Sequence, residues 1–214
     1  MLALTFSLQA RPVEAVHAAV ELLSDTSVVV PGETFHLAVS FEMEPHWHIY
    51  WKNPGASGLP PEFTWELPEG FVAGEIQWPV PKSVSLGGLV SYAYEDTVTF
   101  IVPVNAPQGI EAGADIPIRL DVFYLICKEV CLPGEAAANL TLTAGNSPIA
   151  QNQDVFASAR ESQPNPDSPF ELITTSLEEK VLTVEIKGEA LPDELYFYAA
   201  VEGIADPNAN QNYT

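Results

Sequence analysis

Cys127 and Cys131 are the residues of this chain best suited to redox chemistry, and the chain contains no other cysteine. They flank three residues, Lys128, Glu129 and Val130. On one continuous strand, residues four positions apart lie roughly 13 Å from each other. A disulfide requires Cα atoms about 4.4–6.8 Å apart. The two cysteines therefore either remain unbonded or stand on either side of a turn.

The sequence around the cysteines favours a turn. Residues 119–126 are rich in strand-forming side chains, and residues 137–143 alternate weakly between apolar and polar, as a returning strand would. We expect a hairpin with a three-residue loop at 128–130, or a short helical turn in its place. Residues that flank such a loop face each other at roughly 4.5–5.5 Å, a separation that suits a disulfide.

A disulfide confined to one turn contributes little to stability. In the loop-entropy model a five-residue ring stabilises by about 2 kcal/mol, against about 4.7 kcal/mol for a hundred-residue loop. An exchanging cysteine pair and an inert local disulfide both fit the spacing. The positive charge of Lys128 favours the thiolate form that attacks disulfides, and the negative charge of Glu129 opposes it.

Two blocks of sequence resemble a known protein family. Residues 123–134 read Phe-Tyr-Leu-Ile-Cys-Lys-Glu-Val-Cys-Leu-Pro-Gly. They resemble the cysteine motif in the N-terminal periplasmic domain of DsbD-like and ScsB-like membrane thiol–disulfide reductases. Residues 46–55, His-Trp-His-Ile-Tyr-Trp-Lys-Asn-Pro-Gly, followed by Gly-Leu-Pro-Pro at 58–61, are similar to a pattern of the ScsB-like branch. The resemblance covers residues 20–145 and extends more weakly beyond them.

The resemblance implies a protein-disulfide reductase domain in the bacterial periplasm that needs no cofactor. Cys127 and Cys131 would receive electrons from a membrane-embedded DsbD-like domain and pass them to oxidised periplasmic proteins of thioredoxin fold. The membrane-embedded domain and a thioredoxin-like domain would belong to the same full-length protein, tethered to the inner membrane. We expect Cys131 to be the attacking cysteine.

In the DsbD-like domain, a loop at the place of residues 79–94 caps the cysteine pair with an aromatic residue. A Gly-Gly pair and the lack of periodicity predict a mobile loop here. Tyr92 and Tyr94 are the cap candidates, with Leu89 as an apolar alternative. The other interpretation is an ordinary surface loop with one tyrosine in the core.

His46 and His48 offer a different chemistry. Two positions apart on a strand, they share one face. Together with Cys127 and Cys131 they could hold Cu(I), a soft ion that prefers thiolates, and the ScsB-like branch is associated with copper tolerance. Histidines packed among the aromatic residues of this block are the other interpretation. The alternatives to interchange are therefore a copper-binding module and an interaction domain with an inert disulfide.

The composition is that of a globular β-protein. Hydrophobic residues make up 47% and charged residues 17% of the chain, and 19 prolines and 13 glycines separate short apolar segments. Residues 34–43 alternate between apolar and polar, as in a half-buried strand. About eight strands over residues 19–145 predict an all-β, immunoglobulin-like sandwich.

The two ends of the chain differ from this pattern. Residues 1–18 are interpreted as a signal-peptide remnant or a disordered N-terminus. Residues 146–169 are predicted as a linker with a short helix within 149–162. Residues 170–214 resume β-patterning and predict the start of a second β-domain, which implies that the chain is a fragment. Because this segment is too short for a core of its own, a small extension packed on the first domain is the alternative.

Charge and hydropathy exclude several function classes. A net charge of −21 argues against binding to nucleic-acid phosphates and to anionic lipid. No apolar run approaches the roughly 18 residues of a membrane span. The sequence shows no Ser/His/Asp arrangement and no phosphate-binding loop, so hydrolase and nucleotide chemistry have no support.

Overall fold

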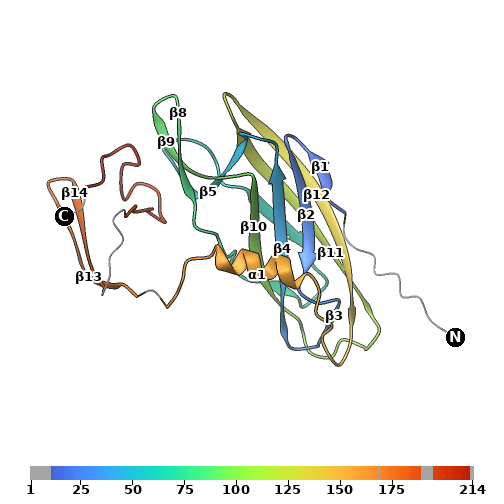
Figure 1. Cartoon of the computed structure of the whole chain (residues 1–214). Helices are drawn as coiled ribbons and strands as arrows, with labels where there is room; N and C mark the ends of the chain where they lie inside the picture. Colours follow the sequence, from blue (N-terminus) through green and yellow to red (C-terminus); the bar gives the residue numbers. More distant parts are fainter. Residues whose placement is uncertain (1–10, 168, 189–194, 213–214) are drawn as a thin grey trace.

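The structure is a computed structural model that describes residues 11–167, 169–188 and 195–212. Two β-sheets stack face to face, a helix lies across one of them, and a small hairpin stands apart from both (Figure 1). The predicted all-β, immunoglobulin-like sandwich is confirmed.

The first sheet has the strand order β1-β2-β4-β10-β7. Its strands are β1 (Val13–Ala15), β2 (Ala18–Ser24), β4 (Thr34–Met43), β7 (Val72–Ala73) and β10 (Thr97–Asn105). The second sheet has the order β3-β12-β11-β5-β9-β8, and β6 also pairs with β11. Its strands are β3 (Val28–Val29), β5 (His48–Gly55), β6 (Glu62–Glu66), β8 (Lys82–Leu86), β9 (Leu89–Glu95), β11 (Asp115–Cys127) and β12 (Cys131–Ala144).

Strand β4 is the centre of the first sheet and was predicted at these bounds. It pairs antiparallel with β2 on one side and β10 on the other. Alternate side chains of the strand are buried in the core: Phe35, Leu37, Val39, Phe41 and Met43. The period-two pattern therefore turns one face of β4 toward the second sheet.

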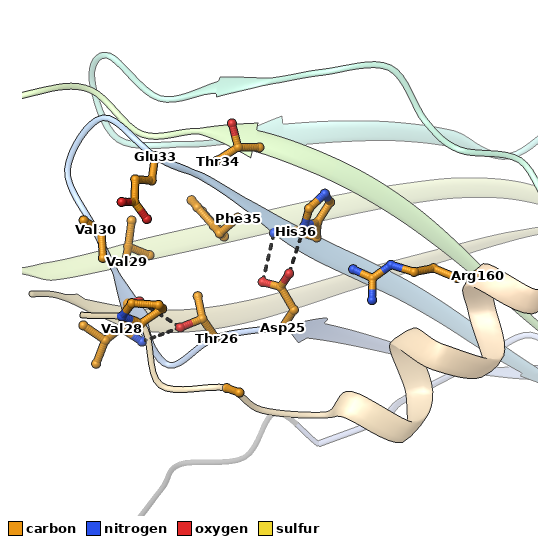
Figure 2. A pocket seen from close by; sticks show the side chains of 12 residues that line it. Asp25, Thr26, Val28, Val29, Val30, Glu33, Thr34, Phe35, His36 and Arg160 are labelled. Carbon is orange, nitrogen blue, oxygen red and sulfur yellow. Dashed lines mark hydrogen bonds and ion pairs between the residues drawn. The ribbon is translucent and has the colours of Figure 1, made fainter. Parts of the chain in front are cut away.

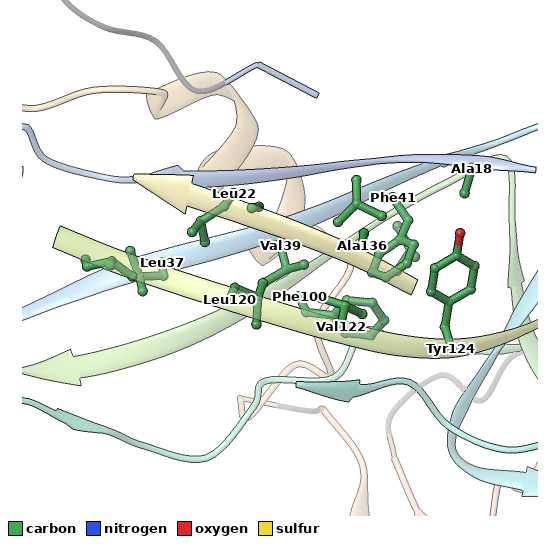
Figure 3. Close-up of a cluster of buried hydrophobic side chains, with 14 of the residues drawn as sticks. Ala18, Leu22, Leu37, Val39, Phe41, Phe100, Leu120, Val122, Tyr124 and Ala136 are labelled. Carbon is green, nitrogen blue, oxygen red and sulfur yellow. The ribbon is translucent and has the colours of Figure 1, made fainter. Parts of the chain in front are cut away.

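The core lies between the two sheets and is rich in aromatic rings (Figure 3). Phe41 contacts Phe100 and Tyr124 edge to face, with ring centroids 6.0 and 5.3 Å apart. Burial of a large apolar side chain stabilises a fold by about 1.5–3 kcal/mol. Because Tyr124 belongs to β11, this packing fixes the strand that ends at Cys127.

Strands β11 and β12 form one long antiparallel hairpin. Its register runs without interruption from the pair Asp115–Thr143 to the pair Cys127–Cys131. The predicted hairpin with a three-residue loop at 128–130 is thus confirmed.

The predicted mobile loop over residues 79–94 is wrong, because most of this segment is the hairpin of β8 and β9. Gly87 and Gly88 have φ angles of 61° and 85°. Two consecutive positive φ angles are what a tight two-residue hairpin turn requires, and glycine adopts them without strain. The Gly-Gly pair therefore connects two strands.

The described part of the N-terminal segment also differs from the expectation of disorder. Residues 1–10 lie outside the described residues, but β1 pairs with β2 at the edge of the first sheet. Val13 and Ala15 pack against the core. The sandwich therefore begins before residue 19.

Helix α1 (Gln153–Glu161) lies within the predicted linker and on the outer face of the first sheet. Phe156 and Ala159 of the helix are buried against Leu23, Ala38 and Ile101. This segment is therefore part of the sandwich's packing.

The C-terminal segment contains a further hairpin, of β13 (Glu171–Glu178) and β14 (Val181–Lys187), whose side chains are mostly exposed. Residues 195–201, within the segment predicted to resume β-patterning, form no strand. They lie against the sandwich, where Tyr198 contacts Trp51 and Asn53 Nδ2 donates to the Ala199 carbonyl at 2.7 Å. The predicted second β-domain over residues 170–214 stays a prediction.

Candidate functional site

The two cysteines form a disulfide at the tip of the β11–β12 hairpin, with their Cα atoms 4.1 Å apart. They are the last pair of the strand register. The backbone N–H of Lys128 donates to the Val130 carbonyl at 3.2 Å, which closes the loop. The geometry thus selects the hairpin and the bonded pair from the alternatives that the spacing left open.

The two cysteines differ in their exposure to solvent. Cys127 is fully buried, whereas Cys131 is exposed. The difference follows from the sheet, because β5 pairs with β11 at His48 and Cys127 and covers the inner cysteine. An incoming thiolate can therefore reach Cys131 more easily than Cys127.

Cys127 lies on the outer face of the second sheet, away from the sandwich core. It forms a small apolar cluster with Tyr50 of β5 and Ala93 of β9, against which Val84 and Leu125 pack. The residues between these positions point the other way, into the core. The sheet thus supports the disulfide on the Cys127 side, while Cys131 is exposed to solvent.

The Tyr50 side chain contacts the disulfide. Its hydroxyl oxygen lies 3.6 Å from Cys131 Sγ, and its side chain is only 1% exposed. The backbone of Gly58 lies against the ring, where a Cβ atom would clash with ring carbons. Sequence analysis missed both residues, although Tyr50 lies two positions from His48 and so on the same strand face.

The two histidines of the predicted pair are not brought together. His46 precedes β5, is exposed and has a positive φ of 71°, whereas His48 is 3% exposed opposite Cys127. Burial lowers the pKa of His48, and the negative charge of Glu95 partly opposes this shift. Among the described residues, no group of three His, Cys, Asp or Glu side chains forms a metal-binding cluster.

The cap candidates lie on β9 and its turn. Tyr92 is buried on the core face, where it contacts Trp51 and Tyr198, and burial raises its pKa to about 12. Tyr94 is also buried there and donates its hydroxyl to the Pro79 carbonyl at 2.7 Å. Alternation along β9 thus turns both rings away from the face that holds the disulfide.

The remaining candidates are exposed. Leu89 is 46% exposed beside the Gly-Gly turn. Lys128 and Glu129 extend into solvent from the loop between the cysteines. All three side chains are thus accessible from solvent.

A cavity of about 320 Å³ lies elsewhere, beside the C-terminal end of α1 (Figure 2). Asp25 is at its centre, with its carboxylate 2.9 Å from His36 Nδ1, and Arg160 points toward it from the helix. Its lining includes neither cysteine, so this cavity is separate from the disulfide.

The sequence matches, over residues 19–143, the family described as the N-terminal domain of thiol:disulfide interchange protein DsbD. This chain belongs to that family. The match contains β11 and its cysteine, the loop and most of β12. The disulfide at the hairpin tip therefore lies within the matched region. No curated protein matches the sequence.

Two solved structures are similar to this chain. The N-terminal periplasmic domain of ScsB from Proteus mirabilis aligns with a TM-score of 0.61 and 19% identity, covering 81% of this chain. This chain spans 65% of that domain's length. The reduced N-terminal domain of DsbD from Neisseria meningitidis aligns with a TM-score of 0.35 and 13% identity, covering 62% of this chain and 90% of that one. The ScsB likeness confirms the fold.

Proposed function

We propose that this chain relays electrons from a membrane-embedded reductase domain to oxidised periplasmic proteins, as a protein-disulfide reductase domain. The observation that carries the proposal is the disulfide at the hairpin tip, with Cys127 buried and Cys131 exposed. In such a pair, Cys131 is accessible to a partner's thiolate, and buried Cys127 serves as the resolving cysteine. Two sulfurs carry two electrons, so the relay needs no cofactor.

The exchange proceeds in two steps, each of which moves one electron pair. A thiolate of the reduced partner attacks Cys131 Sγ, the bond to Cys127 breaks, and Cys127 leaves with the electron pair as a thiolate. The second thiolate of the partner then attacks the partner's own sulfur, the one bonded to Cys131 Sγ in the mixed disulfide. Cys131 leaves as a thiolate, and the partner becomes a disulfide. In the reverse order, the Cys131 thiolate attacks an oxidised substrate and Cys127 resolves the mixed disulfide.

The proposed partners follow from the family and from the exposed tip. They are a membrane-embedded DsbD-like domain, a thioredoxin-like domain of the same full-length protein, and an oxidised periplasmic substrate of thioredoxin fold. Periplasmic location is supported by the ScsB domain, which is described as periplasmic. In the described part of the chain, no helix is long and apolar enough to cross a membrane.

The reduction potential of the Cys127–Cys131 pair tests this proposal. The protein is equilibrated in glutathione buffers, and free thiols are counted by mass shift. We expect a midpoint between about −150 and −280 mV, within the range of exchanging dithiols. A midpoint well below about −300 mV would identify a structural disulfide and contradict the relay.

The Cu(I) alternative remains a prediction, and the same protein samples test it. If the reduced pair binds one equivalent of Cu(I) but forms no intramolecular disulfide at any buffer potential, copper binding replaces the relay as the proposed function. Cys127→Ser and Cys131→Ser serve as controls, because either change removes a thiolate ligand and prevents the disulfide.

A further inference from the structure

We propose that the hydroxyl of Tyr50 acts in the exchange reaction as the hydrogen-bond donor that stabilises the Cys131 thiolate. The inference deepens the proposed function and rests on it. It assigns a role in the reaction to a residue outside the cysteine motif, 81 positions from Cys131 in sequence.

The direction of this hydrogen bond follows from the chemistry of the disulfide. The Tyr50 oxygen lies 3.6 Å from Cys131 Sγ. A disulfide sulfur carries no hydrogen, so the phenol O–H must donate. Burial raises the pKa of Tyr50, with a hydrogen bond to Ser57 opposing the shift, so the phenol keeps its proton at neutral pH. The donor is therefore present before the reaction begins.

The ring of Tyr50 is fixed from several sides. Gly58 lies so close that an added Cβ atom would clash with Tyr50 Cε1. The His48 ring meets it edge to face, with centroids 5.4 Å apart. A donor held in place costs little entropy when charge develops on its acceptor.

Cys131 carries negative charge at two points of the relay. It becomes a thiolate when the mixed disulfide with the reductant breaks, and it is a thiolate again when it attacks an oxidised substrate. Hydrogen bonds to charged groups are stronger than those to neutral ones. The Tyr50 hydroxyl thus stabilises the thiolate more than the disulfide, and it lowers the pKa of the Cys131 thiol.

Four other ionisable groups lie on the elements around the pair. His48 of β5 pairs with Cys127, Glu95 of β9 pairs with His48, and Lys128 and Glu129 occupy the loop. Burial lowers the pKa of His48, so its titration falls below the range in which a thiol titrates. The two loop residues carry opposite charges. All four groups remain unchanged when only the Tyr50 hydroxyl is removed.

The test is the pH dependence of alkylation of reduced Cys131 by iodoacetamide, in the wild-type protein and in Tyr50→Phe. Trypsin cleaves after Lys128, so the two cysteines fall on different peptides and mass spectrometry measures each separately. We expect the pH midpoint of Cys131 alkylation to rise by about one unit in Tyr50→Phe. At a pH below the midpoint, this rise corresponds to about tenfold less thiolate. The rate of exchange with an oxidised thioredoxin-fold protein falls in parallel.

Tyr94→Phe is the matched control, because it removes a buried hydroxyl that bonds a backbone carbonyl. We expect its Cys131 midpoint to equal that of the wild type. An unchanged midpoint in Tyr50→Phe, or an equal rise in both variants, would overturn the inference. Neither result would affect the proposed relay if the wild-type pair exchanges electrons in the glutathione titration. If it does not, the proposed function itself has failed.

Discussion

The two faces of the second sheet carry buried tyrosines with different acceptors. On the core face, Tyr124 and Tyr94 are 0% and 5% exposed, and their hydroxyls donate to the carbonyls of Val16 and Pro79. On the outer face, Tyr50 is 1% exposed, and its hydroxyl donates to Cys131 Sγ. Residue type and burial are nearly the same, and the acceptor differs.

The acceptor decides what each hydroxyl can contribute. A peptide carbonyl stays uncharged throughout any redox cycle, so the hydrogen bonds of Tyr94 and Tyr124 contribute to stability alone. A cysteine sulfur alternates between disulfide and thiolate, so the hydrogen bond of Tyr50 can change the chemistry. Because side chains alternate along a strand, one sheet can separate a structural face from a reactive one.

The largest effect is expected on the reactive face, from removal of a single cysteine. Cys127→Ala should abolish turnover, yet let a partner accumulate as a mixed disulfide on exposed Cys131, because no second thiol resolves it. Cys131→Ala should abolish turnover without this accumulation, since Cys127 is buried. Mass spectrometry under non-reducing conditions measures both species.

Either substitution should destabilise the oxidised protein by only about 2 kcal/mol, the contribution expected of a five-residue ring. Urea unfolding followed by tryptophan fluorescence measures this loss. Equal accumulation of mixed disulfide in both variants would show that burial does not order the cysteines, and would remove the distinction between their roles.

The next effect concerns the core and should leave the chemistry unchanged. Phe100 contacts four aromatic rings, those of Phe41, Phe63, Trp78 and Tyr94. Phe100→Ala should lower the free energy of unfolding by about 3–5 kcal/mol, because it leaves a cavity among these rings. The reduction potential of the protein that remains folded should equal that of the wild type.

Phe197→Ala is the control for this substitution, since it removes the same side chain from a position that is 40% exposed. It should cost far less in urea unfolding. A shifted reduction potential in Phe100→Ala would contradict the separation of the two faces, because it would show that core packing reaches the disulfide.

Local patterns predicted the parts of the fold that depend on neighbours in sequence. The alternation over residues 34–43 gave β4 at its observed bounds, because burial of one face imposes period two. The cysteine hairpin was predictable because loop geometry alone brings Cys127 and Cys131 together. The Gly-Gly pair between β8 and β9 does not distinguish a mobile loop from a turn between short strands, since the two share this composition.

The contacts that complete the site depend on strand order, which a single sequence does not contain. Tyr50 reaches Cys131 only because β5 lies beside β11 in the sheet, although β6 through β10 separate them in sequence. The same strand order places His48 opposite Cys127. The tyrosines of β9 were natural cap candidates from sequence alone, but strand parity turns them into the core.

The smallest expected effect is the pH dependence that buried His48 confers on stability. Burial lowers its pKa in the folded state, and Glu95 partly opposes this shift. The unfolded chain, with a histidine pKa near 6.5, therefore binds more protons as the pH falls below about 6.5. The free energy of unfolding decreases as the pH falls through this window, because protons favour the state that binds more of them.

The urea midpoint of the wild type should accordingly fall between pH 7 and pH 5, and His48→Gln should reduce this dependence. His46→Gln is the matched control, because His46 is exposed two positions away and should leave the dependence at its wild-type size. Comparison of the two variants cancels the contribution of the carboxylates common to both. If both variants show the same pH dependence of the urea midpoint, the outer face does not hold His48 in its neutral form. The side chains of the reactive face would then be less well shielded from solvent than those of the core.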